Sequence, residues 1–135
     1  MSMIQWSDEY SVMVREMDDQ HKKLIGMIND LHEAMKSGKG KDVIENILNG
    51  LADYVSIHFS AEENLMKTHG FPEYLQQKAK HADLTRQVMD FKSQFHSGKA
   101  VLTIEVMNFL KDWLMLHIKG MDKKYGPFLN SKGIS

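Results

Sequence analysis

Hydrophobic residues recur every three or four positions over four long segments of this chain, a spacing typical of amphipathic helices. The pattern predicts helices at about 18–36, 41–67, 72–95 and 100–120, separated by short breaks rich in glycine or containing proline. Connections of only a few residues favour antiparallel neighbours. The predicted fold is therefore all-α, an antiparallel up-down-up-down four-helix bundle.

The two ends of the chain lack this long period. We interpret residues 1–17 as an ordered N-terminal arm that packs across the bundle. Its apolar residues are Trp6, Tyr10, Val12 and Val14. Residues 122–135 are predicted to form a C-terminal turn and short tail, because Pro127 should bar a regular helix there. With the bundle at 18–121, the 135 residues form a single domain.

Composition narrows the classes of function. With 42% hydrophobic and 26% charged residues, the chain is an ordinary globular protein. A net charge of -1, with lysine and arginine spread along the sequence, offers no surface for nucleic acid or an anionic membrane. The start of the chain has neither a basic stretch nor an apolar run, and no segment is long enough to cross a bilayer. We therefore expect a cytoplasmic protein, and we expect a monomer.

The chain has no cysteine, so a disulfide framework, a thiolate zinc site and a cysteine-ligated iron–sulfur cluster are all excluded. Any metal must be held by nitrogen and oxygen atoms.

Several polar residues lie on helix faces that should point inward. His58 and Glu62 are four residues apart, so their side chains lie one turn apart on the same face. His21, His81 and His117 each lie on the apolar side of another predicted helix. A single histidine in such a position is most often a core residue whose ring nitrogens are hydrogen-bonded.

Four such histidines on four separate helices are better explained by one shared metal centre, since side chains from all four helices converge inside a bundle. Two carboxylates, Glu62 and Asp122, accompany them. Asp122 follows His117 by five residues and would be rotated by about 140° on a straight helix. It can join the site only if the helix opens or bulges, which Gly120 makes easy. Four imidazoles and two bridging carboxylates suit two divalent ions such as iron, with zinc or manganese as substitutes.

Several segments, in this order and spacing, carry a resemblance to a known family. They are Trp6, Asp19-Gln20-His21, His58-Phe59, Glu62-Glu63, Gly70-Phe71-Pro72, Lys78-Ala79-Lys80-His81, Trp113-Leu114, His117-Ile118 and Asp122-Lys123-Lys124-Tyr125. With them the chain resembles the hemerythrins, specifically the single-domain bacterial members, over nearly its whole length. The resemblance implies a non-haem diiron protein that binds O2 as a carrier, buffer or sensor and is not an enzyme.

The resemblance also implies a role for each matching residue. His21 and His58 would bind the iron that keeps an open position for O2, and His81 and His117 would bind the other iron. Glu62 and Asp122, with an oxo or hydroxo group, would bridge the two. The walls of the O2 pocket would be Leu24, Ile25, Phe59, Trp113, Leu114, Ile118 and Tyr125, for which plain core packing is an equally compatible interpretation.

The chain departs from the family pattern at Gln77, where a fifth histidine would bind the second iron. A glutamine offers only a neutral amide oxygen, a poorer ligand for iron(II) than imidazole. Gln77 could bind through that oxygen, water or another small ligand could fill the position, or that iron could be lost. We favour a dinuclear site with an altered second iron. Two other functions remain open: a diiron enzyme with peroxidase-like or NO chemistry, and a metal-depleted binding bundle.

Overall fold

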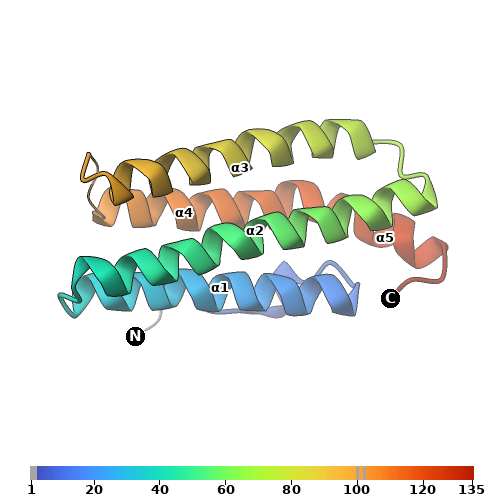
Figure 1. The fold of residues 1–135 in the computed structure, drawn as a ribbon. Helices are drawn as coiled ribbons and strands as arrows, with labels where there is room; N and C mark the ends of the chain where they lie inside the picture. The colour runs from blue at the N-terminus through green and yellow to red at the C-terminus, as the bar shows by residue number, and fades with distance from the viewer. Residues whose placement is uncertain (1–2, 100, 102) are drawn as a thin grey trace.

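The helices predicted from the sequence form an antiparallel four-helix bundle in the computed structural model, which describes residues 3–99, 101 and 103–135 (Figure 1). The bundle helices are α1 (Arg15–Lys36), α2 (Lys41–His69), α3 (Tyr74–His96) and α4 (Ile104–His117). The predicted all-α bundle is therefore confirmed. The expected start of the fourth helix, near Ala100, lies outside the described residues. No described helix combines the length and apolar character needed to span a membrane.

Each bundle helix buries one stripe of its surface against the others. On α2 the buried positions follow the helical spacing of threes and fours and include His58 and Glu62 among aliphatic and aromatic neighbours. The helix ends where Gly70 adopts a left-handed backbone with φ 73°, a conformation that glycine adopts without strain. The chain can then turn back into α3, which runs alongside α2 (Figure 1).

The last helix of the bundle does not end as a simple α-helix. After α4 the chain forms a π-helix, η2 (Ile118–Asp122), and continues as α5 (Lys123–Ser131). The expected bulge between His117 and Asp122 is therefore confirmed. In a π-helix the hydrogen bonds join residues five apart, so Asp122 returns to the face that carries His117.

The expectation that Pro127 bars a regular helix is wrong, because Pro127 lies inside α5. Gly126, the residue before it, has no Cβ to clash with the proline ring. The missing N–H of a proline inside a helix costs about 3 kcal/mol. Burial of Tyr125 and Leu129 on the same helix offsets this cost. The C-terminal segment is therefore a short packed helix instead of a turn and tail.

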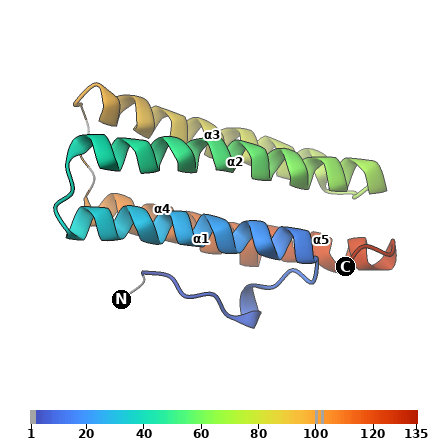
Figure 2. The ribbon, with the colours of Figure 1, turned by 60° about the horizontal axis from the view of Figure 1, so that its bottom comes forward.

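The N-terminal arm lies against the outside of the bundle (Figure 2). As expected, Val12 and Val14 are buried, while Trp6 and Tyr10 are partly buried against the core; the arm also contains a short 3-10 helix, η1 (Asp8–Tyr10). α1 begins at Arg15, three residues before the predicted boundary at 18.

Hydrogen bonds tie the arm to α1. Ile4 donates its N–H to Asn29 Oδ1 at 2.9 Å and accepts from Asn29 Nδ2 at 2.8 Å. Asp18 accepts from the backbone N–H of Val12 at 2.8 Å and from the hydroxyl of Ser11 at 2.6 Å. The arm is thus held in a single register along the helix.

Candidate metal centre

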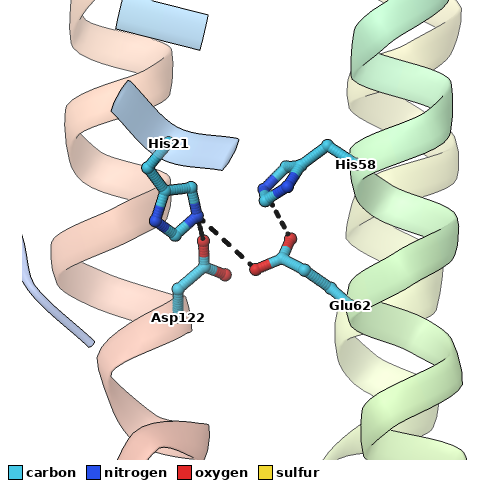
Figure 3. A group of neighbouring side chains, drawn as sticks. All are labelled: His21, His58, Glu62 and Asp122. Atoms are coloured by element: carbon cyan, nitrogen blue, oxygen red, sulfur yellow. Dashed lines mark ion pairs between the residues drawn. The ribbon is translucent and has the colours of Figure 1, made fainter. Parts of the chain in front are cut away.

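Six polar side chains from the bundle meet in its interior, and each is at most 3% exposed: His21, His58, Glu62, His81, His117 and Asp122. Figure 3 shows four of them, from α1, α2 and the end of η2, turned toward one another. The Nε2 atom of His21 lies 2.8 Å from Asp122 Oδ2 and 3.6 Å from Glu62 Oε2. On α2, His58 Nε2 lies 3.1 Å from Glu62 Oε1, as their four-residue spacing predicts.

The other two histidines also lie close to these carboxylates. His81 Nε2 lies 3.5 Å from Glu62 Oε1, and His117 Nε2 lies 3.6 Å from that oxygen. His117 Nε2 is also 3.2 Å from Asp122 Oδ1, a contact that the π-helix makes possible. The six histidine and carboxylate residues that sequence analysis assigned to a metal are therefore brought together.

The six residues divide into two overlapping groups of four. In each group the ligand atoms lie within 4.8 Å of one another, and the groups are His21, His58, Glu62, Asp122 and Glu62, His81, His117, Asp122. The two groups share both carboxylates and differ in their pair of histidines. The described residues thus offer two adjacent positions for cations, each lined by two imidazoles and two carboxylates.

The residues fit metal ions better than they fit hydrogen bonds with one another. His21 Nε2 lies close to Asp122 Oδ2, yet neither atom has a partner in hydrogen-bond geometry among the described residues. The same holds for the Nε2 atoms of His58, His81 and His117. Buried polar atoms without hydrogen bonds are costly, so such a concentration of them needs an explanation. Lone pairs that converge on common points are what a cation requires.

The pKa shifts of the two buried carboxylates also favour a cation in this cluster. Burial acts to raise the pKa of Glu62, but the surrounding histidines, His58 foremost, bring this pKa well below its ordinary value. Burial and then the negative charge of Glu62 raise the pKa of Asp122 well above its usual range. In the protein alone, Asp122 is therefore the harder of the two carboxylates to ionise. Two divalent cations would favour ionisation of both.

Three side chains around this cluster orient it, although sequence analysis gave two of them no role and the third a different one. Gln20 Oε1 lies 2.6 Å from His58 Nδ1 and Glu63 Oε2 lies 2.9 Å from His81 Nδ1, so each accepts the Nδ1 proton and leaves Nε2 facing the cluster. In the sequence, each adjoins a predicted ligand and belongs to a segment that carries the family resemblance.

The third is Tyr125, predicted as a pocket wall. Its hydroxyl donates to Glu62 Oε2 at 2.5 Å. Burial, followed by the charges of Glu62 and Asp122, raises the pKa of Tyr125 well above its usual value, so the phenol remains a donor. Tyr125 therefore holds one oxygen of the central carboxylate.

The residues predicted to wall an O2 pocket are all buried: Leu24, Ile25, Phe59, Trp113, Leu114, Ile118 and Tyr125. Two of the aromatic rings pack on the second pair of histidines. Phe59 stacks on His81 with ring centroids 3.9 Å apart, and Trp113 stacks on His117 at 6.3 Å.

Gln77 is also buried, at 2% exposure, one helical turn before His81 on α3. It lines a cavity of about 160 Å³ together with Lys80 and Lys124.

The chain is similar to known proteins over nearly its whole length. The Hemerythrin HHE cation binding domain matches residues 12–129. A bacteriohemerythrin of Methylococcus capsulatus is 35% identical over 132 residues, covering 97% of this chain and 100% of that protein. A hemerythrin-like protein of Naegleria gruberi is 32% identical over 124 residues, covering 92% of each. A crystal structure of wild-type hemerythrin, 35% identical in sequence, superposes with a TM-score of 0.89 over 93% of this chain and 97% of that one.

Proposed function

The chain belongs to the hemerythrin family, and on that premise we propose that it binds O2 reversibly at two iron ions held by the six-residue cluster. The observation that carries the proposal is the pair of overlapping ligand groups that share Glu62 and Asp122. Asp122 has one oxygen near a histidine of each group, Oδ2 near His21 and Oδ1 near His117, an arrangement suited to bridging two ions. Imidazole and carboxylate together are ligands that iron accepts.

The first ion would be held by His21 and His58, with the open position for O2 on this side. Two ferrous ions, if bound here, would supply the two electrons that reversible O2 binding requires. Gln20 presents His58 Nε2 to the site by accepting the proton of Nδ1, and Tyr125 holds one oxygen of Glu62. Buried Leu24, as one of the proposed pocket walls, excludes water, which would otherwise compete for the open position.

The second ion would be held by His81 and His117, with Gln77 where the family pattern has a fifth histidine. A neutral amide oxygen is a weaker ligand than imidazole, so this ion would have one weakly occupied position. Entry of water or an anion there would favour the ferric state. We therefore propose that reversible oxygenation is poorer, and autooxidation faster, than in a relative with five histidines.

A binding protein fits the relatives better than an enzyme does, since those reported above are named as hemerythrins. On the proposed assignment, the four imidazoles of the cluster would all be ligands, which leaves none of them as an acid or base. In the described part of the chain, no observation favours peroxidase-like or NO chemistry, and retention of six buried ligand residues weighs against a metal-depleted bundle. Three points stay predictions. They are the choice among carrier, buffer and sensor, the monomeric state of the protein, and its cytoplasmic location.

The test begins with the number of iron atoms per chain in protein purified without oxygen. We expect about two. On exposure to O2 a visible charge-transfer band should appear, and removal of O2 should abolish it. Glu62→Gln removes the shared charge, so it should lower the iron content below two atoms per chain and abolish the band. Glu45→Gln, outside the cluster, should change neither the iron content nor the band. The proposal would be refuted if the purified protein contained no iron, or if the visible spectrum of iron-loaded protein did not change on exposure to O2.

A further inference from the structure

The N-terminal arm meets α5 at the residue that follows Tyr125. Gly126 is buried, and a Cβ added to it would lie 2.2 Å from the backbone carbonyl oxygen of Val12. The arm and α5 therefore pack backbone against backbone at this point. Because Tyr125 is the neighbouring residue on α5, the arm touches the helix directly beside the side chain that donates to Glu62. The rotation of α5 about its axis thus depends on where the arm lies.

A second contact, one turn further along α5, holds the same part of the arm. Asn130 Nδ2 donates to the carbonyl oxygen of Met13 at 2.9 Å. Among the described residues, Met13 is the one non-glycine residue with a positive φ, 62°. A residue with a Cβ keeps such a backbone only where surrounding contacts hold it. The side chain of Met13 is 66% exposed, so contacts of its backbone, and not packing of its side chain, hold it there.

Asp18, in the first turn of α1, anchors the other side of this segment. Its Oδ1 accepts from the backbone N–H of Val12 at 2.8 Å, and its Oδ2 accepts from the hydroxyl of Ser11 at 2.6 Å. Ser11 Oγ in turn accepts from the backbone N–H of Met13 at 3.1 Å. Hydrogen bonds to a charged acceptor are stronger than those between neutral groups. One carboxylate therefore holds residues 11–13, the part of the arm that contacts α5.

Another contact between the arm and the bundle contributes less. Glu9 Oε1 lies 3.0 Å from Lys119 Nζ of η2, but the two side chains are 59% and 47% exposed. Exposed ion pairs of this kind add little stability, because water screens them. The bonds to Asp18 are partly buried and directional, so they are better suited to fix the position of the arm.

We propose that Asp18 is a positioning residue for the candidate metal centre. By holding residues 11–13 against α5, it fixes the rotation of that helix and so directs the Tyr125 hydroxyl to Glu62 Oε2. Asp18 itself belongs to neither ligand group. The positioning of Tyr125 rests on the contacts above; its use in holding a carboxylate that bridges two iron ions rests in addition on the proposed function.

The test follows the hydroxyl proton of Tyr125 by NMR in metal-free protein, so it needs neither iron nor O2. A buried phenol proton bonded to a carboxylate should exchange slowly with water and give a separate resonance, which Tyr125→Phe assigns by removing it. Asp18→Ala should speed this exchange by about tenfold or more, because the arm loosens and α5 can turn.

The conservative variant separates positioning from charge. Asp18→Asn keeps an acceptor oxygen for the backbone N–H of Val12 and should restore most of the protection of the Tyr125 proton. A role limited to negative charge, such as interaction with the dipole of α1, would not be rescued by asparagine. It would also be lost in Glu16→Ala, which removes the other carboxylate of the first turn.

Three variants are matched controls and should leave the exchange unchanged. Glu16→Ala tests the first turn of α1, Glu9→Gln breaks the exposed ion pair, and Ser131→Ala removes a hydroxyl that bonds within α5. From the α5 side, Asn130→Ala removes the bond to the arm and should speed the exchange by about threefold.

The proposal is overturned if Tyr125→Phe removes no slowly exchanging resonance, if folded Asp18→Ala exchanges as slowly as wild type, or if asparagine protects no better than alanine. Should Asp18→Ala fail to fold, Ser11→Ala and Asn130→Ala each remove one contact of the arm, and unchanged exchange in both overturns the proposal. Iron content and the O2 band do not enter these outcomes, so failure of the proposed function remains distinguishable.

Discussion

The hydrogen bond from Tyr125 to Glu62 gives a measurable prediction about how the candidate metal centre is held together. Both side chains are at most 1% exposed, and the 2.5 Å contact joins a phenol to a carboxylate whose pKa lies well below its usual value. Tyr125→Phe removes only the hydroxyl oxygen. Because the ring remains, the change leaves little void, and its effect reports mainly on the lost hydrogen bond.

The size of the effect should depend on metal. A hydrogen bond to a charged group contributes about 1.5–3 kcal/mol, so we expect metal-free Tyr125→Phe to lose about 2 kcal/mol of unfolding free energy. In metal-loaded protein the cations compensate the charge of Glu62, and the donor matters less. There we expect a loss of about 1 kcal/mol or below.

Urea denaturation followed by circular dichroism, with chelator and with saturating metal, measures both values. Tyr54→Phe is the matched control: within the described residues its hydroxyl makes no hydrogen bond, and its ring packs under Lys23. It should change stability by less than about 0.5 kcal/mol. The reasoning is refuted if metal-free Tyr125→Phe is as stable as wild type, or if it loses the same free energy with and without metal.

Three further predictions concern the ligand set and the arm. Gln77→His should restore a third imidazole to the second metal position and slow autooxidation by about tenfold or more, measured by stopped-flow decay of the oxygenated spectrum. Gln20→Ala removes the acceptor that orients His58 and should lower metal affinity by about 10- to 100-fold in a chelator competition. Gly126→Ala would place a Cβ 2.2 Å from a backbone carbonyl oxygen of the arm, and should lower stability by about 3 kcal/mol in thermal unfolding. Gly50→Ala, where nothing lies within 4 Å of the added Cβ, should instead raise it by about 0.5–1 kcal/mol.

Each of these has a result that would count against it. Equal autooxidation rates for wild type and Gln77→His would mean that the position does not influence the second metal. Unchanged chelator competition in Gln20→Ala would show that His58 is oriented by other contacts. If Gly126→Ala and Gly50→Ala shift the unfolding temperature alike, the close approach of the arm to Gly126 does not influence the stability of the protein.

Sequence periodicity was sufficient to predict the bundle and the polar residues that meet in its interior. A helix is built from contacts three and four residues apart, so the stripe on α2 and the pairing of His58 with Glu62 are local properties. The need for a bulge before Asp122 followed from the same arithmetic, because five residues do not close an α-helical turn.

The C-terminal segment shows where local reasoning failed. Pro127 disfavours a helix when its own residue type is considered alone. Its neighbour Gly126 and the burial of Tyr125 and Leu129 reverse that preference, and burial is a property of the packed molecule.

The sequence by itself determined which residue types face the interior, because the apolar face of a helix is set by residues three and four positions apart in the chain. Only the tertiary structure decided how their surroundings meet them: that Gln20 reaches from α1 to His58 on α2, and that Tyr125 donates to Glu62. These contacts depend on the axial shift and rotation of one helix against another. Ångström-scale differences in packing set that register, and no pattern within a single helix encodes it.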